Sequence, residues 1–254
     1  MYLSAFLVIM SLMTALWLVS VWLKNASIVD PFWSVGFMMA CVYYYMEGDG
    51  YAPRQTIVLV LTLVWGLRLF GYLFWRNWGK GEDFRYQEFR RRYGAERYWW
   101  VSFFQVFLLQ GVLAWLISAP LWGAQVNNTN GLNIFDYLGI AMWVVGFVFE
   151  AGGDWQLAQF KKKPDSKGKL LTTGLWRYTR HPNYFGDAAV WWGFGLLSIA
   201  GGSYLPVLGS ILMTLLIIKV SGVAMLEKSL AKTKPGYEEY IRRTSAFIPW
   251  PPKK

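Results

Sequence analysis

The residues best suited to chemistry lie between Leu170 and Asp187, in the segment Leu-Leu-Thr-Thr-Gly-Leu-Trp-Arg-Tyr-Thr-Arg-His-Pro-Asn-Tyr-Phe-Gly-Asp. This segment contains His181, the only histidine of the chain, and it comes directly before an apolar run of membrane length. Pro182 has no backbone N–H and therefore suits the first turn of a helix, so we predict that a helix begins there. Arg177, Arg180 and His181 would then crowd the positive end of the helix dipole, which favours an anion such as a phosphate.

Further polar side chains follow the predicted helix start. Asn183 and Asp187 are one turn apart and would lie on one face of the helix, with Tyr184 beside them. This face would continue the cationic cluster, so the sequence predicts a ligand site around the start of this helix.

A second polar stripe lies in the apolar run 54–76. Arg68 is midway along this run, where a charge is costly unless it faces the bundle interior or has a partner. Tyr72 and Arg76 follow at a spacing of four, so the three side chains share one helix face. The stripe leads to the basic loop 77–83, which contains Asn77 and Lys80. It would either line a ligand cleft or form a structural salt bridge.

Acidic and basic residues also end two other apolar runs. Glu150, Asp154 and Lys161 recur at about one and two turns near the end of the fifth run. Lys161 and the two lysines after it would either contact a ligand or anchor the helix at the membrane interface. Glu227 follows the last run, where it would sit at the mouth of the bundle or simply end a helix.

Asp30 comes directly before Pro31 at the start of the second apolar run. With Pro31 at a first helical position, Asp30 would be a natural helix cap. The alternative is a chemical role, because Phe32, Trp33 and lipid around a carboxyl would favour its protonated form, which can donate a hydrogen bond.

Composition sets the class of protein that must position these residues. The chain has 254 residues, of which 55% are hydrophobic and only 16% charged, far from an average soluble domain. We count seven runs long enough to cross about 30 Å of hydrocarbon: 2–23, 31–47, 54–76, 99–122, 134–158, 184–200 and 204–226. No repeat or shift of composition divides the chain. We therefore predict an all-α integral membrane protein with one polytopic domain, 1–254.

The positive charges predict the orientation of this domain. Lysines and arginines concentrate in three segments, 76–97, 161–180 and 228–254, whereas the loops at 122–133 and 200–204 contain none. Because positive loops stay in the cytoplasm, seven spans would place the N-terminus outside and the C-terminus in the cytoplasm. Cys41 is the only cysteine, which excludes an internal disulfide or a thiolate metal cluster. We expect no metal site.

The segment around His181 resembles a known family. Arg180-His-Pro-Asn-Tyr-Phe-Gly186, preceded by Gly174-Leu-Trp176, is similar to the signature of the steroid 5-alpha-reductase C-terminal superfamily, in particular its bacterial DUF1295 type. The resemblance extends from Val29-Asp-Pro-Phe-Trp33 to Phe247-Ile-Pro-Trp250. The Arg-His-Pro-x-Tyr core is shared with integral-membrane methyltransferases of the isoprenylcysteine and phospholipid type.

The resemblance implies a reductase that transfers a hydride from NADPH to an activated C=C bond of a hydrophobic substrate entering from lipid. Asp30, with Tyr72, would polarise the conjugated carbonyl. The residues expected to hold the cofactor are Arg68, Arg76, Asn77, Lys80, Asp154, Lys161, Arg177, Arg180, His181, Asn183, Tyr184, Asp187 and Glu227. The cofactor site would face the cytoplasm, in a bacterial inner membrane.

Two other functions stay open. The shared Arg180-His-Pro core fits a methyltransferase that uses S-adenosylmethionine, although two basic segments are more than a cofactor without phosphate requires. A non-catalytic lipid-binding or transport protein is the third class. Against it, only Arg68 and Lys219 lie near mid-span, so no continuous polar pathway crosses the predicted bundle. The expected partners are membrane lipids and a hydrophobic small molecule, and no nucleic acid.

Overall fold

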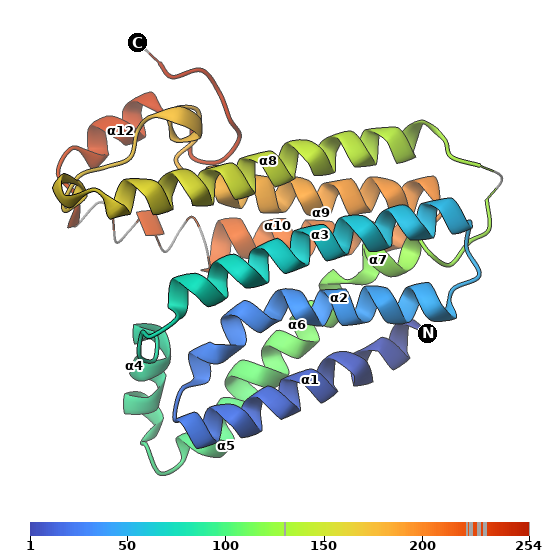
Figure 1. The fold of residues 1–254 in the computed structure, drawn as a ribbon, viewed down its shortest axis with the longest axis horizontal. Helices are drawn as coiled ribbons and strands as arrows, with labels where there is room; N and C mark the ends of the chain where they lie inside the picture. The colour runs from blue at the N-terminus through green and yellow to red at the C-terminus, as the bar shows by residue number, and fades with distance from the viewer. Residues whose placement is uncertain (130, 222, 224–225, 228–229, 231–232, 254) are drawn as a thin grey trace. The chain divides into compact units, whose positions relative to one another are not determined.

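The computed structural model describes residues 1–129, 131–221, 223, 226–227, 230 and 233–253. The fold is all-α, as predicted, and the chain forms two compact units, each described by itself (Figure 1). The first unit contains residues 1–132 and 201–204, and the second contains residues 133–200 and 205–254. The sequence predicts one polytopic domain over the whole chain, which stays a prediction.

The first unit begins with three long helices and continues through shorter ones. Its α-helices are α1 (Tyr2–Leu23), α2 (Val29–Glu47), α3 (Ala52–Asn77), α4 (Phe84–Tyr93), α5 (Tyr98–Ser102), α6 (Leu109–Ile117) and α7 (Ala119–Gly123). A 3-10 turn, Ala26–Ile28, precedes α2, and a π-helical segment, Phe103–Leu108, joins α5 to α6. The basic segment 76–97 thus contains a helix, α4, that the sequence analysis treats as a loop.

The second unit consists mainly of a long helical hairpin. Its α-helices are α8 (Ile134–Lys162), α9 (Pro182–Ala200), α10 (Leu208–Leu215) and α12 (Tyr237–Arg243). The 3-10 turns are Pro164–Ser166, Gly174–Arg177 and Leu205–Val207, and Leu216–Ser221 is π-helical. Helix α9 begins at Pro182, as predicted.

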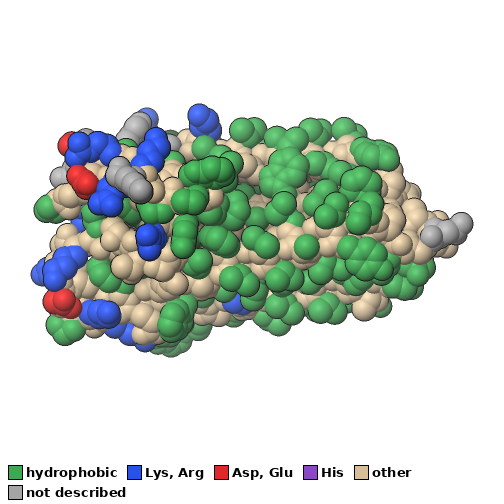
Figure 2. Space-filling model, turned by 90° about the horizontal axis from the view of Figure 1, so that it is seen from above, with side chains coloured by type: hydrophobic (Ala, Val, Ile, Leu, Met, Phe, Trp, Pro, Cys, Tyr) green, Lys and Arg blue, Asp and Glu red, His purple; other side chains and the backbone are tan. Residues whose placement is uncertain are grey.

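Among the described residues, five helical stretches are long and apolar enough to cross a membrane, and they indicate an integral membrane protein. They are Tyr2–Leu23, Ala26–Glu47, Ala52–Asn77, Tyr98–Gly123 and Ile134–Lys162, close to the first five predicted runs. Figure 2 shows hydrophobic side chains over most of one face. The sixth predicted run matches α9. The seventh matches an apolar stretch, Leu205–Val220, and its end lies partly outside the described residues.

Helices α8 and α9 lie side by side and antiparallel (Figure 1). They can approach closely because glycines recur along both helices at intervals of seven residues. A methyl group at Gly186 would lie 2.3 Å from the backbone nitrogen of Glu150, and one at Gly146 would lie 2.5 Å from that of Val190. Only glycine permits such close contact between two helix backbones. The same pattern continues through Gly139, Gly153 and Gly193. The crossing fixes the start of α9 against the end of α8.

Candidate functional site

In the first unit, Asp30 lies in the first turn of α2 and is not its cap, because the helix begins at Val29. The helix-cap interpretation was therefore wrong. The Asp30 carboxylate accepts a hydrogen bond from the Arg85 guanidinium at 2.9 Å and another from the Tyr86 hydroxyl at 2.6 Å. Gln110 donates to the same hydroxyl at 3.3 Å. Asp30 thus joins the start of α2 to helix α4.

Helix α4 is held in place by its own polar contacts. Asp83 caps it by accepting from the backbone N–H of Arg85 at 3.0 Å. Just before it, Glu82 pairs with Arg90 at 2.9 Å and accepts from the backbone N–H of Ala26 at 2.8 Å. These contacts bring Arg85 and Tyr86 to Asp30. Neither residue was predicted from the sequence, although aromatic side chains at 86, 89 and 93 mark one face of this basic helix.

The Tyr86 hydroxyl keeps its proton in this cluster. Burial raises the pKa of Tyr86 above its ordinary value, and the negative charge of Asp30 raises it further, while Arg85 opposes the rise. The phenol therefore stays protonated at neutral pH and donates to Asp30. The expected role of Asp30 as a protonated donor to a substrate carbonyl stays a prediction.

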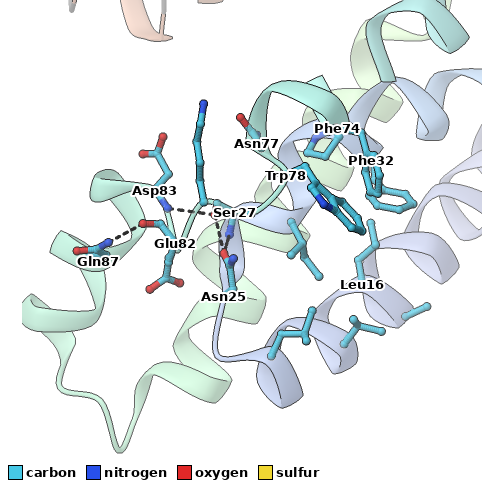
Figure 3. Close-up of a pocket in the computed structure, with 18 of the residues that line it drawn as sticks. Leu16, Asn25, Ser27, Phe32, Phe74, Asn77, Trp78, Glu82, Asp83 and Gln87 are labelled. Atoms are coloured by element: carbon cyan, nitrogen blue, oxygen red, sulfur yellow. Dashed lines mark hydrogen bonds between the residues drawn. The ribbon is translucent and has the colours of Figure 1, made fainter. Parts of the chain in front are cut away.

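A cavity of about 870 Å³ lies nearby in the first unit (Figure 3). Side chains of α1, α2 and α3 form an apolar wall that includes Leu16, Phe32 and Phe74. The last residue of α3, Asn77, and the loop after it, with Lys80, form the polar end of the cavity. These two predicted cofactor residues therefore line a cavity with one apolar and one polar end.

The predicted stripe on α3 is present. The guanidinium carbons of Arg68 and Arg76 lie 6.0 and 5.7 Å from the centre of the Tyr72 ring. The ring thus interacts with two cations. Arg76 also donates to the side-chain oxygen of Asn77 at 3.2 Å. The roles of these four residues toward a cofactor or substrate stay predictions.

In the second unit, the C-terminal tail packs against the loop before α9. Thr179 forms a bridge with Ser245, and its hydroxyl donates to the carbonyl of Phe247 at 2.9 Å. The backbone N–H of Trp250 donates to the Tyr178 carbonyl at 2.9 Å. The tail sequence around Phe247-Ile-Pro-Trp250 and the signature sequence therefore form one structural element, although the residues in contact are 67 and 68 positions apart.

Arg180 is the centre of this element and is only 7% exposed. Its guanidinium binds the Glu227 carboxylate, with Nη2 and Nε at 2.7 and 2.8 Å from one oxygen. It also donates to the carbonyls of Ile241 and Thr244. These contacts direct its donors toward protein groups, whereas the sequence analysis expected them to meet a phosphate.

His181 is buried beside Arg180. Its Nε2 lies 3.3 Å from the Glu227 carboxylate, and its ring stacks on Tyr184 with centroids 5.6 Å apart. Burial lowers the pKa of His181 below its ordinary value, while Glu227 opposes and Arg180 supports this change. The ring is therefore neutral at pH 7. Glu227, Arg180, His181 and Tyr184 form one cluster. Arg180, His181 and Tyr184 were grouped from the sequence, whereas Glu227 was expected at the mouth of the bundle or at a helix end.

A second polar contact joins α8 to the start of α9. The side-chain nitrogen of Asn183 donates to the carboxylate of Asp154 at 3.1 Å, and Asp154 is only 7% exposed. Gly153 lets the two helix backbones approach closely and so positions this pair. A methyl group at Gly153 would lie 3.1 Å from the backbone nitrogen of Asn183. Of the other predicted cofactor residues, Asp187 lies one turn further along α9. Lys161 and Arg177 are exposed.

Additional basic side chains surround a cavity of about 430 Å³ next to Arg180. Arg242, Arg243 and Lys253 line it together with Ser245. Sequence reasoning did not single out these residues, since only the folding of the tail brings them to the signature. The cavity fits an anionic group such as a phosphate. Among the described residues, no group of three His, Cys, Asp or Glu side chains could hold a metal ion.

Sequence comparison identifies the family of this chain. Residues 16–244 match the family described as "Protein of unknown function (DUF1295)". The chain belongs to this family. A 26% identical relative, an uncharacterized protein of Schizosaccharomyces pombe, aligns over 92% of this chain and 75% of its own length.

Two more similarities are local. The 3-oxo-5-alpha-steroid 4-dehydrogenase 1 of Mus musculus is 37% identical over 60 residues, which is 24% of either chain. A protein named "Probable O-methyltransferase ustE" from Ustilaginoidea virens is 41% identical over 64 residues, 25% of this chain and 22% of its own. This DUF1295 protein therefore spans about a quarter of the length of these two relatives. No solved structure matches it.

Proposed function

We propose that this DUF1295 protein is a membrane reductase that uses NADPH to reduce an activated C=C bond of a hydrophobic substrate. The observation that carries the proposal is the buried polar cluster of Arg180, His181 and Glu227 at the start of α9. Its central residue, Arg180, lines a basic cavity. Buried titratable groups beside a cavity are typical of functional sites. The local similarity to a steroid dehydrogenase supports a reductase.

The residues of the second unit would bind the cofactor. The basic side chains Arg242, Arg243 and Lys253 suit its phosphates, and Asp154 with Asn183 offers an acceptor and a donor for neutral hydroxyl or amide groups. Arg180 would hold the cluster together through Glu227 and the tail. Bound NADPH would supply a hydride to the β-carbon of the substrate, and a proton would reach the α-carbon.

The carbonyl of the substrate would be polarised by Asp30, with Tyr72, as the family resemblance implies. In the structure the Asp30 carboxylate accepts from Arg85 and Tyr86, so this role requires Asp30 to be protonated when the substrate binds. Hydrogen-bond donors aimed at an oxygen that gains charge lower the barrier of such reactions. The substrate would enter from lipid, and we propose seven spans with the N-terminus outside and the tail cytoplasmic.

Cofactor binding is the first test. In purified full-length protein, we expect Asn183→Ala and Arg243→Ala each to weaken NADPH binding at least tenfold, since each removes a proposed contact. Arg91→Ala serves as the control because Arg91 is 72% exposed and pairs only with Glu88 among the described residues. Fluorescence titration of NADPH would measure this. Equal affinity in all three variants would contradict the proposed binding residues.

Turnover is the second test. NADPH oxidation would be measured with a panel of enone lipids at equal amounts of folded protein. Asp30→Ala should lower turnover by roughly 10² or more if the carboxyl polarises the carbonyl, whereas Asp30→Asn should retain part of it. Wild-type turnover in Asp30→Ala would remove Asp30 from the mechanism.

The second candidate is a methyltransferase that uses S-adenosylmethionine, and the local similarity to a probable O-methyltransferase favours it. A methyltransferase would give results different from those of a reductase in the same assays. The wild-type protein would bind S-adenosylmethionine and not NADPH, and it would transfer a labelled methyl group to lipid extract. That pair of results would replace the reductase proposal.

A further inference from the structure

The cavity of the first unit has a long apolar wall (Figure 3). On α1 this wall is formed by Leu12, Leu16, Val19 and Leu23, which recur every three or four residues and so share one helix face. Leu23 follows Leu12 by eleven helical steps, about 16 Å, roughly the length of a twelve-carbon chain. Phe32 and Phe74 face the same space. The wall therefore suits an extended acyl chain.

The polar end of the cavity presents hydrogen-bond donors. The side-chain oxygen of Asn25 already accepts from Ser27 at 2.5 and 3.0 Å, and that of Asn77 accepts from Arg76 at 3.2 Å. An amide whose oxygen is occupied offers its NH₂ group to a ligand. Both asparagines line the cavity, so both can donate into it. Such an end favours a head group with acceptor oxygens.

The charge at this end favours an anion. The two acidic residues that line the cavity are already paired, Glu82 with Arg90 and Asp83 with Arg85, each at 2.9 Å. Lys80 also lines it, and among the described residues its ammonium group has no ion-pair partner. Lys80 therefore leaves a positive charge at the polar end.

We propose that this cavity binds an anionic phospholipid of the surrounding membrane, with one acyl chain along the α1 wall and the phosphate against Lys80, Asn25 and Asn77. The cavity volume of about 870 Å³ accommodates one chain and part of a head group. A basic residue beside polar groups at the end of membrane-spanning helices is typical of lipid head-group sites. The proposal does not rest on the reductase activity, but it assigns Asn77 and Lys80, which the sequence predicts as cofactor residues, to a lipid head group.

The experiment compares two lipids on the full chain in a neutral detergent. Native mass spectrometry would measure the affinity of dioleoyl phosphatidylglycerol and of dioleoyl phosphatidylcholine. We expect the wild-type protein to prefer the anionic lipid at least tenfold. Lys80→Glu should abolish this preference, while Lys167→Glu, a matched change at an exposed loop lysine, should retain it.

A second pair of variants tests the apolar wall. Val19→Trp would fill the cavity and should lower the affinity for both lipids at least tenfold. Leu18→Trp is its control, because Leu18 is 58% exposed on α1 and does not line the cavity. Thermal melting would establish that each variant is folded. Equal binding of the two lipids by the wild type, or the same lipid affinity in Val19→Trp and Leu18→Trp, would overturn the proposal. Displacement of the lipid by inorganic phosphate or NADPH would overturn it in favour of a phosphate site.

Discussion

The two units bring their helices together through different contacts. In the second unit, Gly146 and Gly186 place the backbones of α8 and α9 in direct contact. In the first unit, glycines at helix crossings face methionine side chains instead, since a methyl group at Gly66 would meet Met38 and one at Gly111 would meet Met10. Methionine has three rotatable side-chain bonds and adapts to its surroundings, whereas a helix backbone does not.

The polar cluster of the second unit is also more buried than that of the first. Arg180 and His181 in the second unit have side chains 7% and 3% exposed, while Asp30 and Arg85 in the first have side chains 18% and 38% exposed. A buried cluster on a rigid crossing keeps one geometry, and a more exposed one beside a cavity can adjust to a ligand. We therefore expect substitutions in the second unit to affect folding more than their counterparts in the first.

Gly186→Ala should give the largest effect. The added methyl group would lie 2.3 Å from the Glu150 nitrogen and 2.5 Å from the Gly146 carbonyl oxygen, so α8 and α9 would have to separate. We expect a loss of about 3 kcal/mol or more in the free energy of unfolding, measured by denaturant titration in detergent. Gly71→Ala is the control, because no atom lies within 4 Å of a methyl group there. Similar losses in both variants would contradict the rigid crossing.

Arg180→Ala should come next. The substitution leaves Glu227 and two backbone carbonyls without their donor in a buried cluster, which we expect to cost about 3 kcal/mol. Its counterpart Arg85→Ala should cost about 1 kcal/mol, because Arg85 is 38% exposed and water can replace it at Asp30. The same titration would compare the two. A larger loss for Arg85→Ala would reverse the comparison.

The sequence predicted the helices better than the contacts between them. Hydrophobic runs located the long helices and Pro182 located the start of α9, because these signals are local. The glycines at intervals of seven on α8 were also visible in the sequence, but glycine alone does not tell whether a backbone or a side chain faces it. That depends on the neighbouring helix.

The candidate sites were predicted in part, for the same reason. Spacing along one helix correctly placed Arg68, Tyr72 and Arg76 together. It could not show that Tyr86 and Arg85 reach Asp30, or that the tail brings Arg243 near Arg180, since these contacts join segments about 55 to 65 residues apart. Nor could it show that Glu227 pairs with Arg180.

Gly66→Ala should have a moderate effect. A methyl group there would lie 2.6 Å from the Cγ atom and 2.8 Å from the sulfur of Met38, which can move aside. We expect a loss of about 1 kcal/mol, clearly below that of Gly186→Ala. The double variant Gly66→Ala with Met38→Ala should restore part of this loss by removing the clash. A double-mutant cycle without such coupling would show that Met38 does not accommodate the change.

The smallest effect concerns pH and the only histidine of the chain. Because burial lowers the pKa of His181 in the folded state below the ordinary 6.5, the unfolded state binds a proton first as the pH falls. The stability contributed by neutral His181 is therefore complete above pH 6.5. It decreases as the pH falls from 6.5 to the folded pKa and changes no further below that value.

Glu227 opposes the lowered pKa of His181, so Glu227→Gln should lower this pKa further and widen the pH range over which stability is lost. A pKa of His181 that is lower by one pH unit corresponds to about 1.4 kcal/mol. Because the chain contains a single histidine, its ring resonance in an NMR titration reports this pKa directly. Glu82→Gln, which changes a carboxylate of the first unit, is the control and should leave it unchanged. A His181 pKa at or above 6.5, or one that rises in Glu227→Gln, would show that burial does not govern the ring and that the second cluster is more open to water than its contacts indicate.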